Sequence, residues 1–143
     1  MDSLLLFTEI YITIMTKKDI YKNEEVDSII INESTIESIS WLGLRGLDLK
    51  IIIDWNGQED LKNDYDFLNI NTQMIFEFVT DLKIHLDCSN QIGRLGIYDF
   101  SYLKNEDGTY NVNFQFKFGK KGIINFNCNR FSFVIIGTIQ NIV

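Results

Sequence analysis

The stretch Tyr110–Phe118, YNVNFQFKF, alternates apolar and polar side chains without a break. Its aromatic and aliphatic members fall on one side of an extended chain, and its amides and lysine fall on the other. This period of two predicts a half-buried strand, because the apolar positions of an amphipathic helix recur every three to four residues. A slip of one residue would turn every aromatic side chain toward solvent, so the register of this strand is strongly specified.

A second stretch, Leu47–Trp55, LDLKIIIDW, has the same period. We expect its odd-numbered positions to face the core and its even-numbered positions, Asp48 to Asp54, to face outward. Weaker patterns predict further strands on both sides of these two. They are Ile10–Met15, Ile36–Trp41, Met74–Val79, Thr80–Asp87, Ile92–Leu103, Ile123–Cys128, Phe131–Ile136 and a short edge strand at Thr138–Val143.

The segments between these strands carry turn signals. Asn105–Gly108 ends in Asp-Gly, which supplies the positive φ that tight hairpins need. Gly43 and Gly46 bracket a bend, and the run from Gly119 to Gly122 predicts another hairpin. Lys17–Asp27 is charged and is either a loop or a short helix.

The connections are too short for helical crossovers, which predicts antiparallel pairing. The chain lacks both proline and alanine, and alanine is the best helix former. We therefore expect a mostly β fold, with a β-rich α+β fold as the alternative. The predicted architecture is an antiparallel meander that forms a β-sandwich or a strongly curved sheet, with at most one or two short helices.

The chain has 143 residues, a length typical of one domain, so residues 1–143 are predicted to form a single domain. Its 45% hydrophobic content is typical of a globular protein rather than a disordered one. The apolar segment Leu4–Met15 lacks a basic flank and a small-residue cleavage site, so it is a poor signal peptide, and it is too short to span a membrane. Met15 is a candidate for an alternative start, which leaves open whether residues 1–14 belong to the native protein.

The net charge of −7 is concentrated in the first half, where residues 1–66 carry 14 acidic and 6 basic side chains. Nucleic acids and anionic membranes attract basic surfaces, so this distribution argues against both as direct partners. A basic protein partner is compatible with it. We expect a cytoplasmic protein.

Few residues suggest catalysis. The single histidine, His85, lies on the polar side of a predicted strand beside Asp81 and Asp87, with no sign of a nucleophile elbow, so we expect a surface histidine. Cys88 and Cys128 lack metal-type spacing and predict a reduced pair of buried thiols, although a disulfide between strands stays open.

The sequence also lacks the spacing of known metal and phosphate sites. Asp54–Gly57 and Asn63–Asp66 do not match the spacing of a calcium loop. Gly93–Gly96 and Gly119–Gly122 do not lead into a predicted helix that would bind phosphate. We therefore predict a protein that is not an enzyme and has no metal and no cofactor.

The best candidate site lies in and beside residues 56–73, the only long stretch without a clear pattern. Acidic side chains steer the encounter with a basic protein, and aromatic side chains anchor it. A solvated loop is the alternative. The predicted partner-binding residues are Asp54, Trp55, Glu59, Asp60, Asp64, Tyr65 and Asp66.

The chain resembles the small acidic immunity proteins of bacterial polymorphic-toxin systems. The resemblance rests on Trp41-x-Gly43, the strand Leu47–Ile53, the pair Phe76–Leu86 and the closing run Phe114–Phe133. It implies a small, cytosolic, non-catalytic protein that neutralises a toxin by covering or distorting its active site. It implies no particular site residue.

Two other functions stay open from the sequence. The rings of Phe114, Phe116 and Phe118 can line a ligand cavity in a barrel or sandwich, although a packed core is the simpler interpretation. The chain can also be a structural or assembly subunit.

Overall fold

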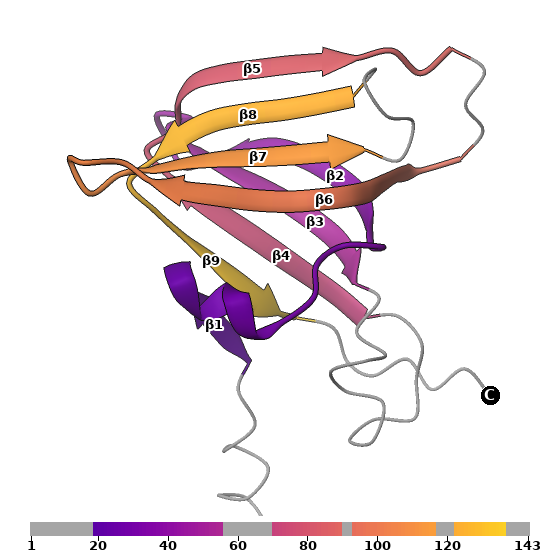
Figure 1. The fold of residues 1–143 in the computed structure, drawn as a ribbon, viewed down its shortest axis with the longest axis horizontal. Helices are drawn as coiled ribbons and strands as arrows, with labels where there is room; N and C mark the ends of the chain where they lie inside the picture. The colour runs from indigo at the N-terminus through magenta and orange to yellow at the C-terminus, as the bar shows by residue number, and fades with distance from the viewer. Residues whose placement is uncertain (1–18, 56–69, 90–92, 117–121, 137–143) are drawn as a thin grey trace, which may run out of the picture.

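The computed structural model of the chain describes residues 19–55, 70–89, 93–116 and 122–136. These residues form nine strands and one short 3₁₀ helix, and every strand pair is antiparallel (Figure 1). The elements are β1 Ile20–Lys22, η1 Asn23–Ser28, β2 Thr35–Leu42, β3 Asp48–Trp55, β4 Ile70–Glu77, β5 Thr80–Leu86, β6 Leu95–Lys104, β7 Tyr110–Phe116, β8 Gly122–Cys128 and β9 Arg130–Ile135. The predicted mostly β, antiparallel fold is confirmed.

The strands follow the order β1-β9-β4-β3-β2-β6-β7-β8-β5 in one continuous, strongly bent sheet. β2 and β6 join its two halves through only two residue pairs, Thr35 with Gly96 and Ile36 with Leu95. The two halves fold against each other, with β5, β8, β7 and β6 in one layer and β9, β4, β3 and β2 behind them at an angle (Figure 1). The sheet therefore encloses its core as a sandwich does.

Two very short links carry the chain between the layers. β4 reaches β5 through Phe78 and Val79, and β8 reaches β9 through Asn129 alone. The Val79 amide donates to the Leu47 carbonyl at 2.8 Å, and the Asn129 amide donates to the Glu77 carbonyl at 2.8 Å. These bonds fix both corners against the layer that contains β3 and β4.

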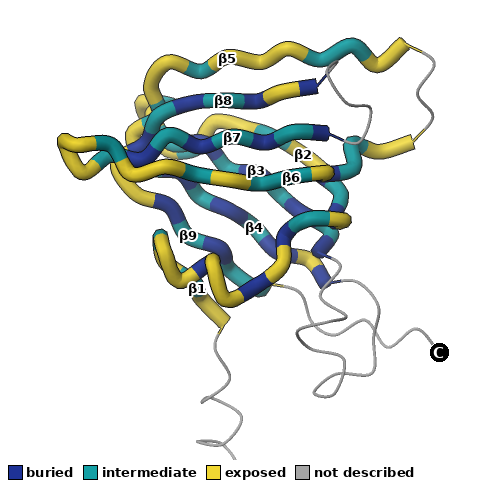
Figure 2. The backbone as a smooth tube through the Cα atoms, viewed as in Figure 1, coloured by how far each residue is buried: buried dark blue, intermediate teal, exposed yellow. Residues whose placement is uncertain are grey.

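Burial alternates along the central strands as the sequence predicts (Figure 2). The predicted inward positions of β3 from Leu49 to Trp55 are buried, and so are those of β7 from Tyr110 to Phe116. Leu47 was expected in the same buried row but is 41% exposed, because it precedes β3 at the tip of the β2–β3 hairpin. Phe118 lies outside the described residues.

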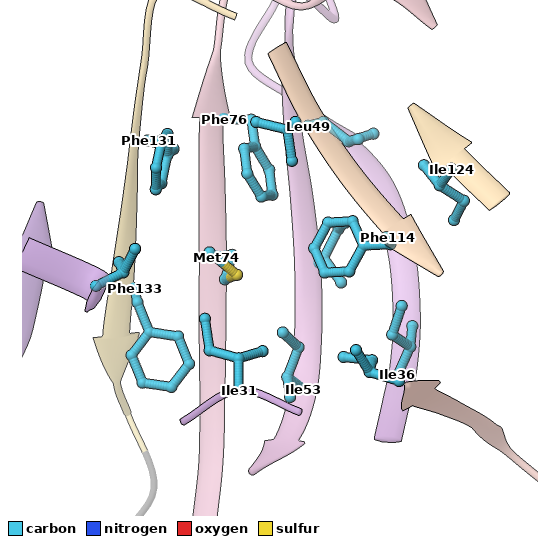
Figure 3. Packing of buried hydrophobic residues seen from close by; sticks show 14 of the residues in the cluster. Ile31, Ile36, Leu49, Ile53, Met74, Phe76, Phe114, Ile124, Phe131 and Phe133 are labelled. Carbon is cyan, nitrogen blue, oxygen red and sulfur yellow. The ribbon is translucent and has the colours of Figure 1, made fainter. Parts of the chain in front are cut away.

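Aromatic rings from both layers fill the interior. Phe76 of β4 lies 4.8 Å from Phe126 of β8 and 6.1 Å from Phe114 of β7, measured between ring centroids. Figure 3 shows the ring of Phe114 close to Phe76. Each buried side chain of this size contributes about 1.5–3 kcal/mol through its removal from water. The packed rings disfavour a ligand cavity behind Phe114.

The predicted turn at Asn105–Gly108 is confirmed. The Asn105 amide donates to the Thr109 carbonyl at 2.7 Å, and Gly108 has the expected positive φ of 88°. Gly43 and Gly46 turn the chain between β2 and β3, as predicted. The hairpin predicted between Gly119 and Gly122 falls mostly outside the described residues.

Several predicted boundaries differ from the observed ones. β4 begins at Ile70, four residues earlier than expected, and ends at Glu77 because the chain then bends into β5. The part of Lys17–Asp27 that the structure describes forms β1 and most of η1, so a short helix is present. The predicted strands Ile10–Met15 and Thr138–Val143 lie outside the described residues.

Candidate protein-binding surface

Large apolar side chains gather at the tip of the β2–β3 hairpin. Leu44 is fully exposed in the turn. Trp41, the next-to-last residue of β2, is 53% exposed. Trp41 of β2 pairs with Leu49 of β3, and Leu47 is the diagonal neighbour of Trp41. The side chains of Trp41, Leu47 and Leu49 therefore lie on the same face of the hairpin. This face is the inner one, because Leu49 is buried.

The corner between β4 and β5 adds Phe78 to this end of the molecule. The Phe78 amide donates to Asp48 Oδ1 at 3.0 Å, one residue after Leu47, and the Phe78 side chain is 50% exposed. We call Trp41, Leu44, Leu47 and Phe78 together the tip patch. Tryptophan, phenylalanine and arginine are enriched in protein interfaces. Arg45 lies in the same turn as Leu44.

Phe78 adopts an unusual backbone conformation, with φ of +56°. A bulky residue in the left-handed region costs of order 1–3 kcal/mol and persists only where surrounding contacts impose it. The hydrogen bonds from Phe78 to Asp48 and from Val79 to Leu47 are such contacts. Strain of this kind is concentrated at functional sites, and here it holds a large ring in solvent.

A polar hollow of about 330 Å³ adjoins the tip patch and shares Phe78 with it. Two carboxylates, Asp81 and Asp107, line the hollow, and Asn127 Nδ2 donates to Asp81 Oδ2 at 3.1 Å. Hydrogen bonds from Thr109 hold the pKa of Asp107 below its usual value, so this carboxylate stays ionised at neutral pH. We call this feature the acidic hollow, and its charge suits a lysine or arginine side chain.

The partner-binding residues predicted from the sequence do not belong to the tip patch or to the acidic hollow. Trp55 is fully buried: its Nε1 donates to the Ile30 carbonyl at 2.7 Å, and its ring packs against Phe133 at 5.1 Å. It therefore offers no surface to a partner, and the expectation that it is an exposed anchor is corrected. Asp54 lies 3.0 Å from Arg94, which also pairs with Glu37, so one guanidinium partly offsets the charge of both carboxylates. The other five predicted residues, Glu59, Asp60, Asp64, Tyr65 and Asp66, lie outside the described residues.

None of the four tip-patch residues was among the partner-binding residues predicted from the sequence. One signal was present, since Leu44 is a large apolar residue between the two glycines of a predicted bend. The position of Phe78 depends on a corner between layers, which the alternation of β4 does not reveal.

The residues considered for catalysis are not brought together. His85 is exposed on β5, as expected for a surface histidine. Cys88 is exposed and Cys128 is buried, so the predicted pair of buried thiols is corrected for Cys88, and both thiols are free. They lie at opposite ends of the paired strands β5 and β8, too far apart for a disulfide. Burial raises the pKa of the Cys128 thiol to about 12.

Two tyrosine–carboxylate bonds attach η1 to the layer that contains β6 and β7. Tyr110 Oη donates to Glu24, and Tyr102 Oη donates to Asp27 Oδ1 at 2.7 Å. Burial and the bond to Glu24 raise the pKa of Tyr110 to about 12, and burial and the bond to Asp27 raise the pKa of Tyr102 in the same direction. The same bond to Tyr110 lowers the pKa of Glu24.

Comparisons with known proteins give no relative: no family model, curated protein or solved structure matches the chain. Within the described part of the chain, no helix is long and apolar enough to cross a membrane. The same residues contain no cluster of three histidine, cysteine, aspartate or glutamate side chains that can hold a metal ion.

Proposed function

We propose that this chain is a protein-binding module that recognises a basic protein through the tip patch and the acidic hollow. The observation that carries the proposal is the exposure of Trp41, Leu44, Leu47 and Phe78 at one corner of the fold. Large exposed apolar side chains that gather at one corner of a domain are typical of an interaction site. A buried aromatic anchor with a polar rim is the usual organisation of such interfaces.

The basic character of the partner is supported by charge. The chain carries a net charge of −7, and Asp81 and Asp107 lie directly beside the tip patch. Carboxylates at the rim of an interface accelerate the encounter with a positively charged partner and reject acidic ones. Binding should therefore weaken as salt concentration rises.

A more specific proposal is that the partner is a bacterial toxin. The resemblance to immunity proteins supports it, and two of the stretches that carry this resemblance, Trp41-x-Gly43 and Phe76–Leu86, contain the tip-patch residues Trp41 and Phe78. If this is correct, the chain should protect cells from a toxin encoded beside it, and Trp41→Ala should abolish the protection. Full protection by that variant would show that the tip patch does not bind the toxin.

The general proposal is tested with two patch variants. Trp41→Ala removes an anchor, and Phe78→Gly removes the exposed ring while relieving the strained φ, so neither should unfold the domain. Partners captured from a lysate of the source organism by the wild type should be lost with both variants, and the purified partner should bind each at least about 30-fold more weakly, or about 2 kcal/mol.

Tyr98→Ala provides the matched control, because Tyr98 is an exposed aromatic side chain on β6 outside the tip patch. This variant should bind like the wild type. Equal binding by Trp41→Ala, Phe78→Gly and the wild type would refute the assignment. Sedimentation of the chain alone completes the test: a dimer that dissociates on Trp41→Ala would make the tip patch a self-association surface instead.

A further inference from the structure

β6 has an edge that its neighbours cover only in part. Within the described residues, β2 pairs with β6 at Leu95 and Gly96 and then diverges from it. Ile97 exchanges backbone hydrogen bonds with the segment before β2: its amide donates to Ser34 and its carbonyl accepts from Glu33. From Phe100 onward no described strand pairs with this edge, while β7 pairs with the opposite edge as far as Lys104.

The direction of the backbone groups on this edge follows from two observed bonds. In an antiparallel strand the amide and carbonyl of one residue point to the same edge, and successive residues alternate. The Phe100 amide points away from β7, because it donates to Asn32 Oδ1 at 2.9 Å. The Asn105 amide points toward β7, because it donates to Thr109. Tyr102 and Lys104 therefore direct their backbone amides away from β7.

A groove runs along this edge. It has a volume of about 490 Å³ and lies between β6, from Phe100 to Tyr102, and the segment that follows η1. Val26, Ile29 and Ile30 supply its apolar wall. The segment that forms this wall crosses below β6 in Figure 1. We call this feature the edge groove.

The surroundings of the edge groove are acidic. Asp27 lines it, and Glu25 and Glu33 are exposed on the same segment. The nearest cation on β6, Lys104, lies 3.7 Å from Glu24 and is balanced by it. An occupant with positive side chains would therefore be favoured over an acidic one.

We propose that the edge groove binds an extended, basic segment of a partner protein as an additional strand beside β6. Strand addition takes its affinity from main-chain hydrogen bonds, which the outward amides of Tyr102 and Lys104 provide, since the Phe100 amide already donates to Asn32. Alternate side chains of the added strand would contact Ile30, which is 49% exposed, and the others would face the carboxylates. This surface shares no residue with the tip patch, so the proposal does not rest on the proposed function.

The first test uses the free chain. Amide hydrogen exchange, measured by NMR, should be faster at Tyr102 and Lys104 than at Ser101 and Leu103, whose amides point toward β7. Slow exchange at both Tyr102 and Lys104 in the free chain would show that another part of the chain already covers this edge. That result would overturn the proposal.

The second test uses a defined probe, an acetylated and amidated octapeptide of alternating lysine and valine. On titration it should shift the amide resonances of Phe100, Tyr102 and Lys104 and slow exchange at the last two. The glutamate–valine counterpart should bind roughly tenfold or more weakly, because the edge groove is acidic. A lysine–valine peptide with methylated backbone nitrogens on its pairing edge should not bind. Shifts confined to other strands, or equal binding of all three peptides, would contradict strand addition.

Two pairs of variants separate backbone pairing from nonspecific charge attraction. Lys104→Pro removes an outward amide that the ladder with β7 does not use, whereas Lys104→Ala keeps this amide and removes the side chain. Peptide binding should fall with the proline variant and persist with the alanine variant. Ile30→Lys should also weaken binding, while Ile20→Lys should not, since Ile20 is similarly exposed on β1 outside the edge groove, 46% against 49% for Ile30. The proposal would be refuted if the peptide bound the two variants of each pair with equal affinity.

Discussion

The two tryptophans occupy opposite ends of one hairpin and have opposite environments. Trp55 ends β3 and is fully buried, whereas Trp41 lies near the end of β2 and is 53% exposed. Both lie in rows of alternating side chains that point toward the core. The alternation of a strand therefore determines which side a residue faces, and what covers that side is decided elsewhere in the chain.

The difference arises from the segment between η1 and β2. This segment crosses the ends of β3, β4 and β9, where Ile31 lies beside Ile53 and Phe133 (Figure 3) and the Ile30 carbonyl accepts the Trp55 indole hydrogen bond. At the other end of the hairpin, β2 has left β6 after Ile36, and the described residues leave Trp41 half-exposed. The closed end supports the fold, and the open end carries the exposed side chains of the tip patch.

Truncating the two tryptophans should have unequal effects on stability. Trp55→Ala leaves a large cavity and removes the indole hydrogen bond to the Ile30 carbonyl, so we expect a loss of about 3–5 kcal/mol in the free energy of unfolding. Trp41→Ala removes a half-exposed side chain and should cost less than about 1 kcal/mol. Urea denaturation monitored by far-ultraviolet circular dichroism measures both values.

Phe133→Leu provides a control for this comparison, because it disturbs the ring packed against Trp55 without creating a cavity as large. Its loss should be intermediate. Similar losses for Trp41→Ala and Trp55→Ala would mean that the open end also contributes strongly to stability, and the distinction between the two ends would fail.

A smaller effect should follow from the bonds that attach η1 to β6 and β7. Tyr110 has a pKa of about 12 in the folded chain and about 10 in the unfolded chain. A group whose pKa is raised by folding stabilises the fold fully below its unfolded pKa and loses this contribution as pH rises through the folded value. The stability advantage of the wild type over Tyr110→Phe should therefore shrink between about pH 10 and 12.

Urea titrations at pH 8 and at pH 11 measure this difference. Tyr98→Phe serves as the control, since Tyr98 is exposed and should give the same small difference at both pH values. A constant advantage over Tyr110→Phe across the range would show that the bond to Glu24 does not stabilise η1 in solution.

The sequence was sufficient for the fold class, because the period of two in Leu47–Trp55 and Tyr110–Phe118 is unambiguous and the described connections are short. It was insufficient for the strand order and for the binding surface. Trp55 and Trp41 have similar local surroundings in the sequence, and Trp55 is buried because residues 29–34 and Phe133 cover it. Phe78 is exposed because two strands bend into the second layer at that point, and no local pattern encodes such a corner.

The smallest expected effect is spectroscopic, and it tests the comparison without a partner. The chain has two tryptophans, so Trp55→Phe leaves only Trp41 as the fluorophore and Trp41→Phe leaves only Trp55. We expect a red-shifted emission and strong acrylamide quenching from Trp41, and a blue-shifted emission with weak quenching from Trp55, because water and quencher reach only the first ring. In urea the two variants should become alike. Weak quenching of Trp41 in the folded chain would mean that this ring is covered in solution, and the tip patch would then lose the exposure on which its proposed role depends.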